Sequence, residues 1–283
     1  MRDLGTPVLD NHLHLDRQRG QGIEAVKDFA RSGGTHMLVI NKPSWHLDVE
    51  AESGEDFSAV FEETIETVEA ASEVLPGTAW PVLGVHPALI SRLVDEREFA
   101  VEEARELMQA GIELAGEYAA DGPAVAIKSG RPHYDVDDAV WEASNAVLRT
   151  ALEVAAEAGV AVQLHTEQTE DLTEVGEWAE AAGLPPKRVV KHYSTGRTDG
   201  VTPSVMSETD YLERAIDLGE PFLMETDFVD DPDRPGAVLG PKTVPRRVDW
   251  MLENGYEDAV ETAHAEVPSA VYGIDTRATL TDR

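Results

Sequence analysis

The feature that most limits what this chain can fold into is the regular alternation of short apolar stretches with longer amphipathic ones. The apolar stretches are rich in β-branched residues, and the amphipathic ones repeat apolar residues at intervals of three and four, which predicts alternating strands and helices. Strands are expected at residues 7–14, 36–41, 79–86, 124–128, 161–165, 189–192, 201–206 and 222–227, the seventh being the weakest. Eight such units in 283 residues predict a (β/α)₈ barrel of the TIM type, formed as one domain over residues 1–283.

Polar side chains stand at the C-terminal ends of these strands. His12 and His14 end the first strand, and residues two apart in a strand point to the same face. The later strands end in His86, Lys128, His165, His192 and Asp227. In a TIM-type barrel these strand ends converge on one mouth, where the chemistry lies. Burying so many polar groups without partners would cost several kcal/mol in sum. A metal ion supplies the missing partner, because neutral imidazoles and carboxylates are metal ligands.

Further polar residues lie close to the predicted mouth. Arg131 and His133 follow the fourth strand. Arg131 is a candidate for holding an anionic group of the substrate, with an ion pair to a carboxylate as the alternative. His133 is interpreted either as a lining residue of the mouth or as a structural residue. Asp10 shares the face of His12 and is expected to orient one of the two first-strand histidines by a hydrogen bond. The remaining histidines are interpreted as ordinary surface or core residues: His36, His46 and His264.

Lys128 is unusual because it ends an apolar strand in a chain with very few lysines. An ammonium group beside metal cations would be repelled, so it must move away, pair with a carboxylate such as Asp227, or lose its charge. Burial near cations lowers the pKa of a lysine, and the neutral amine can then take up CO₂. The resulting carbamate has two oxygens that are suited to bridging two metal ions. A carboxylated Lys128 is therefore one hypothesis for this position.

The charge of the chain restricts its environment and its partners. Acidic residues number 55 against 23 basic ones, which gives a formal net charge of −32. Molar salt would screen the resulting repulsion, since the Debye length falls to about 3 Å at 1 M, and a salt-loaded cytoplasm such as that of halophilic archaea is the favoured interpretation. The alternative is an acidic protein that merely avoids polyanions. Nucleic acid is therefore expected only as a substrate, and the binding of a membrane is not expected.

Two further exclusions follow from the sequence. The chain has no cysteine, so disulfides and thiolate metal sites are ruled out, and any metal is held by nitrogen and oxygen. Residues 1–7 lack the apolar core of a signal peptide, and no apolar run approaches the roughly 20 residues that cross a bilayer. A cytoplasmic location is expected.

Three segments resemble the signature segments of TatD-related hydrolases, a branch of the metal-dependent amidohydrolase superfamily. They are V-L-D-N-H-L-H-L-D at residues 8–16, G-V-H-P at 84–87 and M-E-T-D at 224–227. The resemblance implies a (β/α)₈ barrel with one or two divalent metal ions. It implies that His12 and His14 bind the first metal, that His165 and His192 bind the second, and that Asp227 contacts the nucleophilic water. It places His86 near the substrate and matches Glu225 to the acidic residue of the last motif.

The chain departs from the TatD pattern at two strands. Lys128 in I-K-S-G stands where the family usually has the glutamate of G-E-I-G, and other amidohydrolase branches, including phosphotriesterase-like lactonases, have a carboxylated lysine there. The sixth-strand segment K-H-Y-S-T-G differs from the usual H-C-F-S-G but keeps His192. The metal ligands therefore match more closely than the features that select a substrate.

Three functional hypotheses follow. The first is a metal-dependent hydrolase that cleaves a phosphoester, such as a nuclease or a small phosphodiesterase, with zinc, manganese, nickel, iron or magnesium as the metal. The second is a lactonase or amidohydrolase with a binuclear centre bridged by carboxylated Lys128. The third is a non-catalytic barrel in which the Lys128 ammonium replaces one metal ion.

Overall fold

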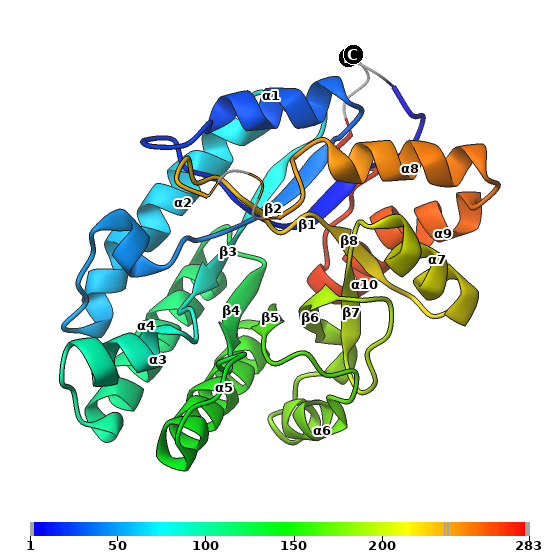
Figure 1. The fold of residues 1–283 in the computed structure, drawn as a ribbon. Helices are drawn as coiled ribbons and strands as arrows, with labels where there is room; N and C mark the ends of the chain where they lie inside the picture. The colour runs from blue at the N-terminus through cyan, green and yellow to red at the C-terminus, as the bar shows by residue number, and fades with distance from the viewer. Residues whose placement is uncertain (1–2, 235, 237, 281–283) are drawn as a thin grey trace.

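The structure, a computed structural model, describes residues 3–234, 236 and 238–280. In this part of the chain the strands form one parallel sheet in the order β8-β7-β6-β5-β4-β3-β2-β1-β9 (Figure 1). The strands are β1 (Leu9–His14), β2 (His36–Ile40), β3 (Ala79–Gly84), β4 (Ala126–Gly130), β5 (Ala161–His165), β6 (Val189–Ser194), β7 (Thr202–Met206), β8 (Leu223–Glu225) and β9 (Phe228–Val229). The fold is the predicted TIM-type (β/α)₈ barrel, and the weak seventh strand is present as β7.

Helices α1 to α7 lie outside the sheet in the connections between strands, and α8, α9 and α10 follow the last strand (Figure 1). They are α1 (Ile23–Arg31), α2 (Ser58–Ser72), α3 (Leu89–Ser91), α4 (Val101–Asp121), α5 (Asp138–Ala158), α6 (Thr173–Ala181), α7 (Thr209–Leu218), α8 (Thr243–Glu253), α9 (Glu257–Glu261) and α10 (Val267–Tyr272). The connection from β6 to β7 has no helix, which departs from eight complete βα units. Gly196 and Gly200 in that connection have positive φ angles of 113° and 88°, which favour a turn over a helix.

The short strand β9 closes the barrel. β9 follows β8 after two residues and pairs in parallel with β1, so the two ends of the sheet meet. The backbone amides of Asp227 and Asp230 donate hydrogen bonds to the carbonyl oxygens of His12 and His14, at 2.9 and 3.1 Å. The seam between the last and first strands therefore runs directly beside the two histidines of β1.

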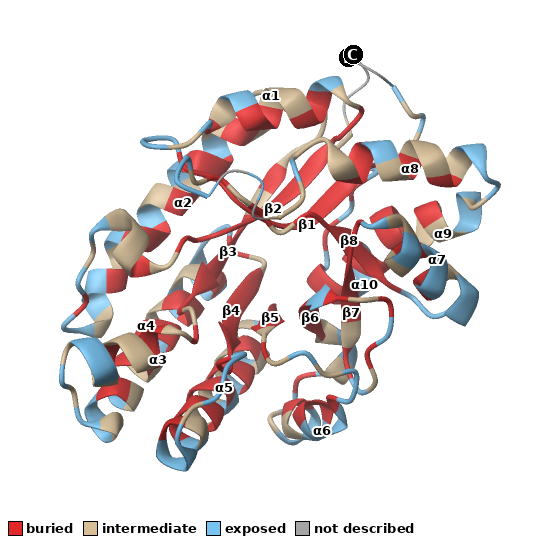
Figure 2. Ribbon diagram, in the orientation of Figure 1, coloured by how far each residue is buried: buried red, intermediate tan, exposed pale blue. Residues whose placement is uncertain are grey.

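The apolar core has two layers on either side of the sheet. The interior of the barrel holds small and branched side chains such as Leu38, Ala126 and Val190. The layer between sheet and helices is larger, and each helix buries one face against the strands while its other face stays in solvent (Figure 2). Gly84 allows β3 to approach β4 closely, because a Cβ atom there would lie 2.0 Å from the Lys128 carbonyl oxygen. Tight packing thus fixes the strand ends that carry the polar residues.

The C-terminal helical segment packs against the interior of the barrel. The residues Val267, Val271 and Tyr272 of α10 belong to the same buried cluster as Leu9, the first residue of β1, and Leu38 in the middle of β2. Among the described residues, no helix is both long enough and apolar enough to span a membrane.

His264, just before α10, generates a prediction about acid stability. It is fully buried, its Nδ1 accepts the amide hydrogen of Leu9 at 3.0 Å, and burial lowers its pKa to about 3. Between pH 6.5 and about pH 3, His264 binds a proton in the unfolded chain but not in the folded chain. We expect the free energy of unfolding to fall as the pH drops from 6.5 towards 3, with this residue contributing up to about 1.4 kcal/mol per pH unit.

Urea unfolding of the metal-free protein between about pH 4 and pH 7 measures this slope. The variant His264→Gln keeps an acceptor for Leu9 but does not titrate, so its slope should be smaller than that of the wild type. Equal slopes for the two proteins would contradict the assignment.

Candidate metal centre

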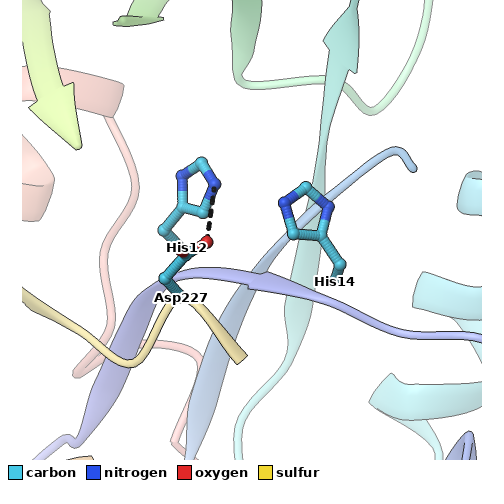
Figure 3. Close-up of side chains that lie close together, drawn as sticks. All are labelled: His12, His14 and Asp227. Carbon is cyan, nitrogen blue, oxygen red and sulfur yellow. Dashed lines mark ion pairs between the residues drawn. The ribbon is translucent and has the colours of Figure 1, made fainter. Parts of the chain in front are cut away.

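A pocket of about 510 Å³ opens at the C-terminal ends of the strands. All seven residues predicted from the strand ends line it, namely His12, His14, His86, Lys128, His165, His192 and Asp227, and His133 lines it as well. Figure 3 shows three of them, with His12 and His14 presented by β1 and Asp227 from the turn between β8 and β9 beside His12. The barrel therefore gathers side chains that lie up to 215 positions apart in the sequence.

Two overlapping groups of side chains have ligand atoms close enough to share one metal ion. One group is His12, His14 and Asp227, and the other is His12, His192 and Glu225. Within each group the ligand atoms lie within 4.8 Å of one another. His12 Nε2 and Asp227 Oδ1 are 3.8 Å apart. All of these ligand atoms are nitrogen or oxygen, as required by a chain without cysteine.

Hydrogen bonds fix which nitrogen of each histidine faces the pocket. The Nδ1 of His14 donates to the carbonyl oxygen of Ile40 at 3.0 Å, and that of His12 contacts Gln163 Oε1 at 2.6 Å. The Nδ1 of His192 contacts Glu225 Oε1 at 3.3 Å. A histidine whose Nδ1–H is engaged in this way presents the Nε2 lone pair as a metal ligand.

Burial keeps these imidazoles neutral. It lowers the pKa of His14 to about 3 and holds the pKa of His12 and of His192 well below 6.5. Lys128 lowers all three pKa values further. Neutral imidazoles keep the lone pairs that coordinate a metal. The positive charge of Lys128 acts against a cation at the same place, so a metal ion is favoured there only when the amine is uncharged.

Lys128 points into the centre of the site. It is 2 % exposed, and its Nζ lies 3.5 Å from His12 Nε2. Burial lowers the pKa of its amine, and the charges of Asp227 and Glu225 counteract that effect. Burial raises the pKa of Asp227. The two groups thus form a buried acid and base at the floor of the pocket.

A row of imidazoles leads from the rim of the pocket to its floor. His133 Nδ1 lies 2.8 Å from His165 Nε2, and His165 Nδ1 lies 2.8 Å from His192 Nε2. His86 packs beside this row, with its ring centroid 4.7 Å from that of His165. The His86 Nδ1 accepts the amide hydrogen of Ala88 at 3.2 Å, so its Nε2–H is free to donate into the pocket.

Arg131 does not line the pocket. Its guanidinium donates to the Glu167 carboxylate at 2.5 and 3.2 Å and stacks over the Trp141 ring at 4.8 Å. The ion-pair alternative therefore describes this residue, and the prediction of a substrate contact is wrong. The reason is that Glu167, in the loop after β5, reaches the arginine across two neighbouring strand ends.

Asp10 does not contact a histidine ring. The register of β1 against β2 shifts between Asp10 and Leu13, which disrupts the side-chain alternation from which the prediction was made. The carboxylate instead accepts the amide hydrogen of Thr226 at 3.1 Å and its hydroxyl hydrogen at 2.7 Å. It also accepts the amide hydrogen of His12 at 3.3 Å. Asp10 thus joins β1 to the turn that carries Asp227, and burial raises its pKa to about 7.

Glu225 lies behind the pocket rather than in its lining. Its Oε1 accepts the amide hydrogen of Tyr193 at 2.6 Å, in addition to its contact with His192. Burial, reinforced by the negative charge of Asp227, raises its pKa well above 4.5. Tyr193 and Asp227 both adopt positive φ angles, 60° and 49°, which are costly for residues other than glycine. Backbone strain is therefore concentrated at this site, as is common where function requires it.

Several residues of the site were not predicted from the sequence. His46 lines the pocket, so its interpretation as an ordinary residue is wrong, because the short helical turn Ser44–Leu47 after β2 lies over the mouth. Trp45, Tyr193 and Arg234 also line it. Gln163 was missed although it has the same inward parity on β5 as His165, which was the available signal.

The family comparison covers nearly the whole chain. Residues 9–273 match the model of the family described as TatD related DNase. An uncharacterized protein of Methanocaldococcus jannaschii is 34% identical over 281 residues, which cover 95% of this chain and 96% of that protein.

Solved structures share the fold at low sequence identity. A TatD-like protein from Archaeoglobus fulgidus has a TM-score of 0.62 at 17% identity, covering 94% of this chain and 100% of that one. A mutant of a PTE-like lactonase from Deinococcus radiodurans has a TM-score of 0.61 at 17% identity, covering 94% and 95%.

The role of Asp10 generates a prediction. Replacing Asp10 by alanine removes the acceptor of three buried donors at the seam between β1 and β8. We expect the free energy of unfolding of the metal-free protein to fall by about 1–3 kcal/mol in urea denaturation. The exposed Asp217 on α7 provides a control, and Asp217→Ala should change stability by less than about 0.5 kcal/mol. Equal stability of Asp10→Ala and the wild type would contradict the seam role.

Proposed function

The chain belongs to the TatD-related DNase family, and we propose that it is a hydrolase that cleaves phosphoesters with the help of one or two divalent metal ions. The observation that carries the proposal is the set of neutral, buried imidazoles whose Nε2 atoms face a common pocket with Asp227. Hydrogen bonds engage the Nδ1 atoms of these imidazoles, and a cation would supply the partner for the Nε2 lone pairs that face the pocket.

Within this proposal the ligands divide into two groups. His12, His14 and Asp227 hold the first metal ion, and Lys128 lies beside them. His165 and His192 hold the second, because the contact between their facing nitrogens at 2.8 Å is one that a shared cation would replace. A bound divalent metal would lower the pKa of a coordinated water from about 15.7 towards 7 and polarise the oxygen of the electrophile.

The chain's own residues handle the proton and the substrate. Asp227 accepts a proton from the attacking water and returns it to the leaving group. His86 donates its Nε2–H to an oxygen of the substrate. His133, at the outer end of the row of imidazoles, lies beside the entrance and is proposed to contact the substrate there.

Lys128 is proposed to act as a carbamate when metal is bound. Its uncharged amine attacks the carbon of CO₂: the N–C bond forms while the π electrons of one C=O bond move to oxygen, and a solvent water takes the proton that leaves the nitrogen. Burial favours this chemistry because it stabilises the uncharged amine. The carbamate would restore a carboxylate at the position where TatD-related hydrolases usually have a glutamate.

The pocket and the net charge favour a small phosphoester over duplex DNA. A cavity of about 510 Å³ has the size of a small-molecule site. A chain with a net charge of −32 repels a polyanion unless salt screens it. We infer that the protein works in a salt-rich cytoplasm and that nucleic acid can be bound only as a substrate, with the end of one strand at the metal centre.

A second candidate function is favoured by Lys128. A lysine at this position, together with His12, His14, His165, His192 and Asp227, also suits a lactonase or amidohydrolase of the carboxylated-lysine type. The phosphoester and the lactone interpretations share the metal centre and differ in the electrophile that the pocket accepts.

A hydrolysis panel in molar KCl tests the proposed function. The protein is dialysed against each divalent metal and then assayed with four substrates: a phosphodiester, a phosphomonoester, a lactone and an amide. We expect a phosphoester to be cleaved fastest, chelation to abolish the activity, and Asp227→Asn to lower kcat by about 10²–10⁴-fold. Cleavage of the lactone or the amide alone would overturn the phosphoester proposal. No cleavage together with less than one metal per chain would support the non-catalytic barrel.

Lys128 variants test the carbamate separately. We expect ¹³C-bicarbonate to give the metal-loaded wild type an additional carbonyl ¹³C resonance that is absent from Lys128→Met. Lys128→Glu, which supplies a permanent carboxylate, should retain more activity than Lys128→Met, which has a similar length and no charge. The absence of the resonance at neutral pH, or equal activity of the two variants, would contradict the carbamate.

A further inference from the structure

A connected layer of polar side chains lies inside the barrel, directly beneath the pocket. The chain's interior is otherwise apolar at this level, and every member of the layer is buried. The layer comprises Asn11, Gln163, Ser204, Glu225 and Tyr272. Apart from Glu225, no member belongs to the predicted site, and none of them lines the pocket.

Gln163 is held in one orientation by its amide hydrogens. Its Nε2 donates to the Asn11 carbonyl oxygen at 2.9 Å and to the Tyr272 Oη at 3.0 Å, which uses both donors. The side-chain oxygen is thereby directed at His12 Nδ1, 2.6 Å away, where it can only accept. His12 must then carry its proton on Nδ1 and present Nε2 to the pocket.

The other half of the layer reaches His192. The Asn11 side-chain amide donates to Ser204 Oγ at 2.9 Å, and the Ser204 hydroxyl donates to the Glu225 carboxylate. That carboxylate in turn contacts His192 Nδ1 at 3.3 Å. The layer therefore sets the ring orientation of two histidines that come from different strands, β1 and β6.

Tyr272 connects this layer to the C-terminal helix. It lies on α10, its side chain is buried against the interior cluster, and its hydroxyl reaches Gln163 from below. Burial raises the pKa of the phenol, so the hydroxyl keeps its proton. A phenylalanine would fill nearly the same space, so the hydrogen bond with Gln163 is what the hydroxyl adds.

We propose that Gln163 and Tyr272 are positioning residues of the metal centre: they fix His12 with its Nε2 towards the metal, although neither residue touches the pocket. This inference rests on the proposed metal-dependent function. Partners that orient a ligating histidine from behind typically contribute 10–100-fold to metal affinity. Helix α10 thus supports the metal site as well as the base of the barrel.

The test measures metal affinity in full-length variants by competition with a chelator, with Zn²⁺ as the probe, in molar KCl. Gln163→Met keeps the length of the side chain and removes the acceptor, and we expect the dissociation constant for Zn²⁺ to rise about 10–100-fold. Tyr272→Phe removes only the hydroxyl, and the rise should be smaller, about 3–10-fold. Tyr256→Phe, on a half-buried tyrosine that packs against Trp250, is the matched control and should leave the constant unchanged.

Two further measurements separate positioning from a purely structural role. Nitrogen NMR of ¹⁵N-labelled histidine in the metal-free wild type should show His12 protonated at Nδ1 alone, and in Gln163→Met a mixture of both tautomers. Thermal unfolding of the metal-free Tyr272→Phe reports any general loss of stability.

The outcomes distinguish this inference from the proposed function. A wild type that binds no divalent metal would contradict both. A wild type that binds metal, with Gln163→Met and Tyr272→Phe binding it equally tightly, would overturn only the positioning role. Should Tyr272→Phe unfold, the tautomer of His12 in Gln163→Met decides, and an unchanged Nδ1–H signal there overturns the proposal. Should Gln163→Met unfold, the Zn²⁺ affinity of Tyr272→Phe decides, and an unchanged dissociation constant overturns the proposal.

Discussion

The site depends on buried imidazoles whose pKa values are lowered by burial, so that the rings are neutral. At the mouth of the barrel, water is replaced by packed strands, and a protonated histidine there would lie beside Lys128 in a medium that solvates charge poorly. The rings therefore stay neutral and keep their lone pairs. Lone pairs that converge within a few ångströms are costly to leave without a partner, and a divalent cation is the partner that nitrogen and carboxylate oxygen share.

The rest of the architecture serves to hold those lone pairs in place. The seam formed by Asp10 and Thr226 aligns the strand that carries His12 and His14 with the turn that carries Asp227. Beneath the pocket, the polar layer directs Nδ1 of His12 and His192 away from the metal position. The strained backbone at Asp227 is held by the hydrogen bond from its amide to the His12 carbonyl, so a contact that closes the barrel also places Asp227 beside His12.

The barrel and most of its pocket residues could be predicted from the sequence, because strand alternation places His12, His14, His165 and His192 at the same end of their strands. Three features could not be predicted in this way. The register shift in β1 turns Asp10 towards the seam, and no local residue pattern signals such a shift. Arg131 is occupied by Glu167, 36 positions away, and an acidic chain offers too many carboxylates for sequence to choose among them. His46 reaches the pocket through a loop, whose path depends on tertiary contacts.

A crystal structure of the protein grown with a divalent metal, with anomalous scattering recorded at the absorption edge of that metal, tests the central claim most directly. The account predicts an anomalous peak at the mouth of the barrel, about 2.0–2.3 Å from the Nε2 atoms of His12 and His14 and from an oxygen of Asp227. A pocket without a peak, in which the Lys128 ammonium pairs directly with Asp227, would contradict it.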